Sequence, residues 1–142
     1  MKSPALLPAE HAHVSQVRAF LAAVASGDGP RMIAQFQQLF AEEAVFVLPG
    51  HNQLSGRYAG KAAILEAFGR IAALSEGTFS PWVHNMAGNA AQVFSQVTLR
   101  AQHRGKTLRH PAVEVHSFNE HGQVGELRLY PEDVTVLDAF WS

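Results

Sequence analysis

His110-Pro111-Ala112-Val113-Glu114-Val115-His116-Ser117-Phe118 is the stretch that decides how this chain folds. Its alternation is typical of a β-strand, with β-branched Val113 and Val115 marking one face. A side-chain period of two places Glu114 and His116 together on the opposite face, about 7 Å apart along the strand. If that face is covered, a carboxyl group and an imidazole share one pocket. If water covers it, they are ordinary surface groups.

This stretch belongs to a series of four expected strands that fills the second half of the chain. Their ranges are about 78–87, 91–103, 107–118 and 123–130. Glycine and asparagine in the short intervening segments are typical of tight turns. Pro131 ends the last strand, and Asp133 can cap a short final helix. We expect the tail Phe140-Trp141 to pack over the open end of the fold or against a partner subunit.

The first half of the chain is mainly helical. Apolar side chains recur at helical spacing in three ranges, about 13–26, 30–40 and 61–74. A short strand is expected over 42–48, followed by a polar, glycine-rich loop over 51–60. Helices followed by antiparallel strands predict an α+β fold. We expect a flexible tail over residues 1–10 and one domain over 11–142.

Composition excludes several classes of function. The chain has 142 residues, of which 47% are hydrophobic, so a buried core is expected. Eleven Lys and Arg residues against 12 Asp and Glu residues form no basic stripe, which argues against nucleic acid or an anionic membrane as partner. The absence of cysteine excludes thiol chemistry and suits a reducing compartment, so the cytoplasm is the expected location.

Several short motifs, in their order along the chain, carry a resemblance to a known family. They are Phe40-Ala41-Glu42-Glu43-Ala44-Val45-Phe46, Pro49-Gly50-His51-Asn52, Leu54-Ser55-Gly56-Arg57-Tyr58-Ala59-Gly60-Lys61, Asn119-Glu120-His121-Gly122-Gln123-Val124, Tyr130-Pro131-Glu132-Asp133 and Asp138-Ala139-Phe140-Trp141. With them the chain resembles the nuclear transport factor 2-like superfamily, in its SnoaL-like and ketosteroid-isomerase-like branch. The resemblance implies a cystatin-like α+β fold, in which a cone-shaped, curved antiparallel sheet is wrapped by three helices from the N-terminal half.

The catalytic residues of this superfamily carry over only in part. At the position of the steroid isomerases' general base the chain has Leu48, and at that of their oxyanion-hole tyrosine it has Phe20. Glu114 matches their oxyanion-hole carboxylic acid in type. Where the SnoaL-group cyclases use His and Asp, the chain has Leu127 and Leu129. Neither known catalytic set is therefore intact.

Glu114 and His116 are nevertheless the predicted catalytic pair. In the family's cone this face of the strand looks inward, which implies burial. Burial raises the pKa of a carboxyl group, and a neighbouring charged His lowers it again. We expect Glu114 to act as acid or oxyanion donor, with His116 or His84 as base. A structural hydrogen-bonded pair is the alternative.

Further side chains are predicted to contact a ligand. They are His84, Trp82, His51, Tyr58, Phe20, Leu48 and His110. Trp82, His84 and Met86 share one strand face if the register is regular, whereas His51 and Tyr58 lie on the loop at the cone's mouth. The predicted apolar lining is Phe20, Phe46, Leu48, Leu65, Phe68, Val97, Leu99, Leu127 and Leu129. For each, simple core packing or hydrogen bonding within the loop is the alternative.

Metal ligation is a weaker candidate. His110, Glu114 and His116 with His84 are suitable ligand types for zinc or iron, but they form no compact spacing motif. No metal and no cofactor are therefore predicted.

The functional hypothesis is a protein that binds a small, mostly apolar molecule in the cone cavity and catalyses an acid/base isomerisation, cyclisation or dehydration. The alternatives are a non-catalytic binding protein and a dimeric scaffold with a filled core. Charged and aromatic side chains alternate opposite to the inward positions, including Phe94, Arg100, Glu126, Arg128 and Tyr130. They predict a homodimer through the outer sheet face.

Overall fold

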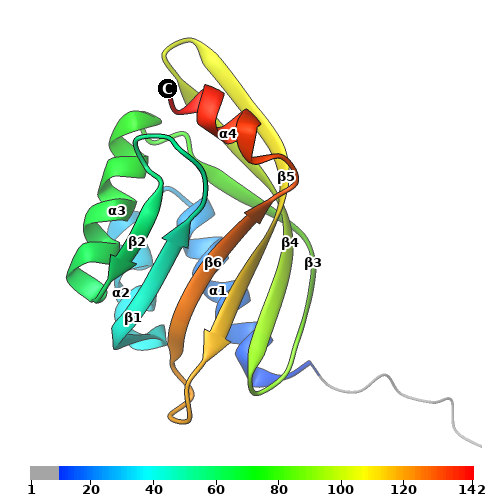
Figure 1. The fold of residues 1–142 in the computed structure, drawn as a ribbon. Helices are drawn as coiled ribbons and strands as arrows, with labels where there is room; N and C mark the ends of the chain where they lie inside the picture. The colour runs from blue at the N-terminus through cyan, green and yellow to red at the C-terminus, as the bar shows by residue number, and fades with distance from the viewer. Residues whose placement is uncertain (1–9) are drawn as a thin grey trace, which may run out of the picture.

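The computed structural model describes residues 10–142. Ten elements follow one another along the chain (Figure 1). They are α1 (Ala12–Ala25), α2 (Gly29–Leu39), β1 (Phe40–Leu48), β2 (Gly56–Ala59), α3 (Lys61–Leu74), β3 (Ser80–Gly88), β4 (Gln92–His103), β5 (Lys106–Phe118), β6 (Val124–Pro131) and α4 (Val134–Phe140). The expected α+β class is confirmed. Of the expected tail over 1–10, all but Glu10 lies outside the described residues.

One six-stranded sheet contains every strand, in the order β2-β1-β6-β5-β4-β3. The long strands β4, β5 and β6 pair as an antiparallel meander. The expectation of a fully antiparallel sheet is wrong for one pair of strands. Strands β1 and β6 run parallel, with Phe46 beside Leu127. This pairing is possible because a long connection through β2, α3 and β3–β5 separates the two strands in sequence.

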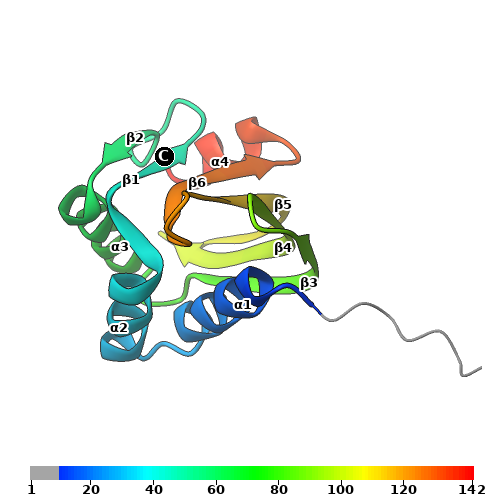
Figure 2. The same cartoon turned by 90° about the horizontal axis from the view of Figure 1, so that it is seen from below.

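The sheet is strongly curved, and α1, α2 and α3 lie on the side toward which it curves (Figures 1 and 2). Helix α1 packs against β3, whereas α3 packs against β1 and β2. The helices therefore bridge the two edges of the curved sheet and enclose a hydrophobic core. Among residues 10–142, no helix has both the length and the hydropathy to cross a membrane.

Strand β2 was not expected, because its residues were assigned to a loop. It pairs antiparallel with the second half of β1, with Tyr58 beside Phe46. Four residues that include glycine and arginine carry no usable alternation, so only the long-range pairing defines this strand. The first strand also begins earlier than predicted, at Phe40, because the chain passes from α2 into β1 without a loop.

A bulge in β3 changes the face on which its side chains lie. The register against β4 shifts between Val83 and Asn85. Trp82 therefore faces outward while Met86 packs against the core. The expectation that Trp82, His84 and Met86 share one face is wrong, because the extra residue of a bulge reverses the alternation beyond it.

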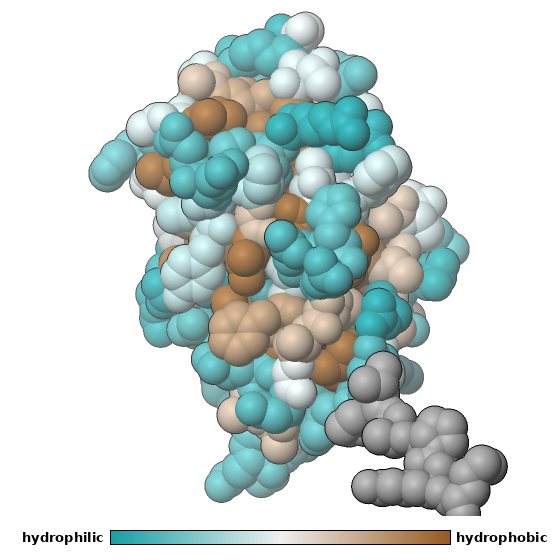
Figure 3. Space-filling model, turned by 90° about the vertical axis from the view of Figure 1, so that its right-hand side faces the viewer, coloured by the Kyte–Doolittle hydropathy of each residue, from teal (hydrophilic) through white to brown (hydrophobic). Residues whose placement is uncertain are grey.

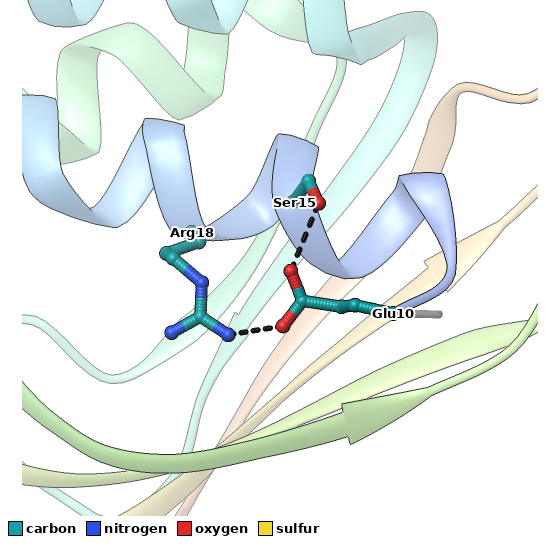
Figure 4. A network of polar contacts seen from close by, with 3 residues as sticks. All are labelled: Glu10, Ser15 and Arg18. Carbon is teal, nitrogen blue, oxygen red and sulfur yellow. Dashed lines mark hydrogen bonds and ion pairs between the residues drawn. The ribbon is translucent and has the colours of Figure 1, made fainter. Parts of the chain in front are cut away.

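Glu10 contacts the first turns of α1 (Figure 4). Its carboxylate accepts a hydrogen bond of 2.9 Å from the Ser15 hydroxyl and forms an ion pair with Arg18. The hydrogen bond from Arg18 is the main reason that the pKa of Glu10 lies below its usual value. Glu10, which was assigned to the expected tail, is therefore held against α1.

The loop after β1 is tied to α4 by one carboxylate. Asp138 Oδ1 accepts hydrogen bonds from the His51 backbone N–H (2.8 Å) and from Asn52 Nδ2 (2.9 Å). Gly50 lies directly beneath this contact at φ +98°, and a Cβ placed there would lie 2.3 Å from Asp138 Oδ1. Glycine is thus required here both by backbone conformation and by space.

We expect Gly50→Ala to lower the free energy of unfolding more than Gly105→Ala does. Both glycines have positive φ, but a Cβ at Gly105 meets nothing within 4 Å. The control variant should therefore lose only about 1 kcal/mol from the left-handed conformation. Gly50→Ala must in addition displace Asp138. Urea unfolding of the two variants measures the difference, and equal losses would contradict this account.

Candidate functional site

A cavity of about 230 Å³ lies between the inner sheet face and the helices. Most of its wall is apolar, and its large apolar side chains include Phe20, Phe46, Leu48, Phe68, Phe79, Leu99, Leu108, Leu127, Leu129, Leu137 and Trp141. Two members of the predicted lining, Leu65 and Val97, pack into the core without reaching it. Sheet, helices and the C-terminal segment all contribute to its wall.

The side chain of Glu114 contributes a buried carboxyl group to this wall. It lies on β5 between Ser95 of β4 and Leu129 of β6, and only 8% of the residue is exposed. The even-numbered residues of β5 from Leu108 to His116 are all buried. The face of β5 that carries Glu114 is therefore covered and is not exposed to water. Within residues 10–142, Glu114 Oε2 is buried without a hydrogen-bond partner.

Burial shifts the protonation of Glu114. Removal from water disfavours the charged carboxylate, and this raises the pKa of Glu114 from its usual 4.5 to about 7. The protonated and ionised forms are therefore both accessible near neutral pH. A carboxyl group in this condition can donate or accept a proton without a large free-energy cost.

His116 is buried on the same strand face but does not line the cavity. Its ring packs against Phe20 and Phe40, with ring centroids 6.3 and 6.2 Å away. Burial lowers the pKa of His116 to about 3, so the imidazole is neutral at physiological pH. The expected shared pocket is therefore incomplete, because aromatic packing surrounds His116 while Glu114 alone faces the cavity.

The residues at the positions of the family's catalytic groups lie around one cavity. Phe20, Leu48, Leu127 and Leu129 all line the cavity together with Glu114. Four of these five side chains are apolar. These five positions therefore share one cavity, and among them only Glu114 can exchange a proton.

The other inward and loop residues serve mainly structural contacts. His110 Nε2 accepts a 2.9 Å hydrogen bond from the Asp133 backbone N–H, at the start of α4. The Tyr58 hydroxyl donates to the Leu54 carbonyl oxygen (2.7 Å). The His51 side chain is exposed. None of these three side chains borders the cavity.

Trp82 and His84 lie away from the cavity as well. The guanidinium of Arg100 stacks 4.1 Å from the centre of a Trp82 ring on the outer face. His84 Nε2 lies 2.7 Å from the Thr98 hydroxyl. Trp82 pairs with Thr98 on the outer face, ahead of the bulge, so neither of these residues, both predicted as ligand contacts, is brought to Glu114.

The sequence analysis did not predict the cavity-lining residues that come from turns and from the ends of helices. Asp28, Ser75, Leu137 and Trp141 border the cavity from the α1–α2 turn, the end of α3 and the C-terminal segment. No local pattern marks them, because they become neighbours only when the helices close over the sheet. Of the two expectations for the Phe140-Trp141 tail, packing on this chain's own fold is the one observed, because both residues are buried and Trp141 lines the cavity.

The candidate metal ligands do not converge on one point. Among the described residues, no three His, Asp or Glu side chains lie close enough together to hold a metal ion. His110, Glu114 and His116 are spread along one strand instead of converging on a point.

Comparisons with known proteins agree with this architecture. Uncharacterized proteins of Mycobacterium tuberculosis and Mycobacterium bovis are each 28% identical to the chain, covering 94% of it and 98% of their own length. Among solved structures, Bal32a from a soil-derived mobile gene cassette superposes with a TM-score of 0.83 at 28% identity, covering 92% of this chain and 96% of that one.

Two further solved structures share the fold at lower identity. A protein of unknown function with a cystatin-like fold, from Xanthomonas campestris, superposes with a TM-score of 0.81 at 24% identity, covering 92% of this chain and 98% of that one. A candidate SnoaL-like polyketide cyclase from Jannaschia sp. CCS1 gives 0.72 at 18% identity, covering 99% of both chains. Because the model of the SnoaL-like domain matches residues 17–127, most of the chain, this protein belongs to the SnoaL-like family.

Proposed function

We propose that this protein binds a small, mostly apolar molecule in the cavity and transfers a proton to or from it through Glu114. One observation carries the proposal: a buried carboxyl oxygen without a hydrogen-bond partner among the described residues lines a mostly apolar wall. Buried polar atoms are nearly always paired, so an unpaired one in a cavity favours a ligand or water as its partner.

The chemistry that fits is isomerisation, cyclisation or dehydration. Each requires a proton to leave one atom of the ligand and another atom to receive one. A single carboxyl group whose pKa is about 7 can perform both steps, taking the proton as carboxylate and returning it as carboxylic acid. His116 remains neutral and outside the cavity wall, so the proposal assigns the proton transfer to Glu114 alone.

A non-catalytic binding protein is the second candidate. It is favoured by the four apolar side chains at the family's other site positions, since they leave Glu114 without a polar partner in the cavity. A scaffold with a filled core is disfavoured by the volume of about 230 Å³. A cytoplasmic location stays a prediction from the absence of cysteine.

Glu114→Gln separates the enzyme from the binder. A panel of small apolar ketones and alcohols is first screened by the shift in Tm, and bound compounds are then tested for conversion by mass spectrometry. We expect the variant to retain affinity within about fivefold, because glutamine keeps the shape, and to lose turnover by about 100-fold or more. Glu132→Gln, an exposed control, should change neither quantity.

Two outcomes would count against catalysis. If wild-type protein binds compounds but converts none of them, the binding protein is the better description. If Glu114→Gln and Glu132→Gln lose turnover equally, the proton transfer does not depend on the buried carboxyl group.

The pH dependence of stability tests the protonation of Glu114. The folded protein keeps this proton where the unfolded chain has released it, so the contribution of Glu114 to stability is full below about pH 4.5 and is lost as the pH rises to about 7. Glu114→Gln removes this loss. Its free energy of unfolding, relative to wild type, should rise by up to about 3 kcal/mol between pH 4.5 and 8.

Urea unfolding at pH 4.5 and 8 measures this difference. His116 titrates in the opposite sense, since its lowered pKa makes stability fall as the pH drops below 6.5. Because both proteins contain His116, its contribution cancels in the comparison. A difference that does not change with pH would show that Glu114 titrates as an exposed carboxyl group.

We also propose that two copies associate through the outer sheet face. Trp82, Phe94 and Tyr130 are about half exposed there, at 49%, 46% and 53%. Figure 3 views the molecule from the side of β3, where hydrophobic side chains gather among hydrophilic ones. Apolar side chains exposed on one face of a sheet are typical of an isologous interface.

Substitution on this face should separate the two copies. We expect the wild-type protein to sediment as a dimer and Phe94→Glu as a monomer. The new carboxylate would be buried in the interface with the second copy of the chain. Ile33→Glu is the control, since Ile33 is 44% exposed but lies on α2. Sedimentation velocity gives the masses. A wild-type monomer, or a dimer in all three proteins, would contradict the proposed interface.

A further inference from the structure

Three neighbouring polar side chains on the inner sheet face have buried atoms without a hydrogen-bond partner in the described part of the chain. They are Ser95 of β4 and Glu114 and His116 of β5. Of the six such side-chain atoms in residues 10–142, four belong to these three residues: Ser95 Oγ, Glu114 Oε2 and both ring nitrogens of His116. Buried polar atoms are nearly always paired, so four unpaired ones in one place indicate a shared partner that is not a protein group.

The register of the sheet brings these three side chains together. Ser95 lies directly opposite Glu114, and His116 follows two residues later on the same face of β5. In antiparallel strands, opposite residues have Cβ atoms about 5 Å apart and diagonal neighbours about 7–8 Å apart. The sheet curves toward this face (Figure 2), which brings the ends of inward side chains closer than their Cα atoms. A water molecule with hydrogen bonds of about 2.8 Å joins atoms up to about 5.6 Å apart, so it can bridge such a group.

The surroundings of this group are apolar. The side chains that flank the three residues in the sheet, or pack against the His116 ring, are Met86, Val93, Leu127, Leu129, Phe20 and Phe40. None of them is a hydrogen-bond donor or carries a charge. The other carboxyl group in the cavity wall, Asp28, is exposed. These neighbours therefore offer the three polar side chains no alternative partner.

Buried polar side chains of the same types are paired elsewhere in the fold. The Ser75 hydroxyl donates to the Ile71 carbonyl oxygen (2.7 Å), and His110 Nε2 accepts from the Asp133 backbone N–H (2.9 Å). In both cases the partner is a backbone group at the end of an element. Strands β4 and β5 each pair with a strand on both sides, so their backbone groups are used within the sheet. A partner for the inner face must come from elsewhere.

We propose that Ser95, Glu114 and His116 bind an internal water molecule behind the cavity wall. Water in a protein interior makes about three hydrogen bonds to groups that are otherwise unsatisfied. Here it donates to Glu114 Oε2 and bonds the Ser95 hydroxyl and one ring nitrogen of His116. A hydroxyl and a neutral imidazole each donate and accept, so both fit this role. Ser95 and His116 do not line the cavity, which separates this site from a ligand there.

The bound water positions Glu114. A hydrogen bond to Oε2 limits rotation of the carboxyl group and leaves Oε1 as the oxygen that can meet a molecule in the cavity. The bond also favours the carboxylate form, because hydrogen bonds to a charged acceptor are the stronger ones. Ser95 and His116 are therefore positioning residues. This consequence for proton transfer rests on the proposed function, whereas the water site itself does not.

Two measurements on the wild-type protein test the water. A crystal structure at high resolution should show an ordered oxygen within about 3.2 Å of both Ser95 Oγ and Glu114 Oε2. Magnetisation transfer in NMR should connect a long-lived water to the ring protons of His116. A direct hydrogen bond between Ser95 and Glu114 with no water beside it would overturn the inference, as would the absence of both signals.

The titration of Glu114 tests the positioning role. Carbon-13 NMR of glutamate-labelled protein follows its carboxyl signal against pH. Ser95→Ala should raise the midpoint by about one pH unit, because the carboxylate loses a group that helps to hold its water. Ser117→Ala is the matched control, since this hydroxyl accepts from Gln92 on the other face of β5 and should leave the midpoint unchanged.

Substitution of His116 gives a second, independent comparison. His116→Gln keeps a donor and an acceptor and should retain both the water and the wild-type midpoint of Glu114. His116→Leu removes both groups and should raise the midpoint as Ser95→Ala does. Thermal unfolding followed by circular dichroism identifies the variants that fold.

The outcomes separate this inference from the proposed function. If Ser95→Ala and Ser117→Ala leave Glu114 with the same midpoint, the positioning role is wrong. If the water and the shifted midpoint are both found while the wild-type protein converts no compound, the water site stands and the proposed proton transfer fails.

Discussion

The burial of one carboxyl group on a central strand is the constraint on which this structure depends. Glu114 has Ser95 on one side and Leu129 on the other, so the registers of β4, β5 and β6 together fix its position. A slip of β5 by one residue would turn Glu114 to the surface and Val113 or Val115 to the core. The fold therefore holds an energetically unfavourable group in place through many backbone hydrogen bonds.

The same constraint explains why the cavity is chemically simple. Polar side chains outside its wall join segments of the chain: Asp138 holds the loop after β1, and His110 holds the start of α4. Few polar side chains are left in the wall itself. Glu114 then experiences the low polarity of the wall, which raises its pKa to about 7. The apolar wall and the reactivity of the carboxyl group thus have a common origin.

Sequence reasoning reached the parts of this arrangement that depend on local periodicity. Alternation along residues 110–118 was enough to place Glu114 and His116 on one face, and helical spacing gave α3 the bounds Lys61–Leu74. It failed where distant pairing decides the outcome. The outward position of Trp82 arises from its pairing with Thr98 of β4, and the burial of His116 arises from its packing against Phe20 and Phe40 on other elements. No single-strand pattern contains either fact.

The alternation of side chains between the two faces of β4, β5 and β6 has one more consequence. Each strand presents one set of side chains to the interior and an interleaved set to the exterior, as Leu129 and Tyr130 do on β6. A codon change at either position alters one surface and leaves the other intact. Relatives that share this backbone can therefore diversify what they recognise inside without rebuilding what they present outside.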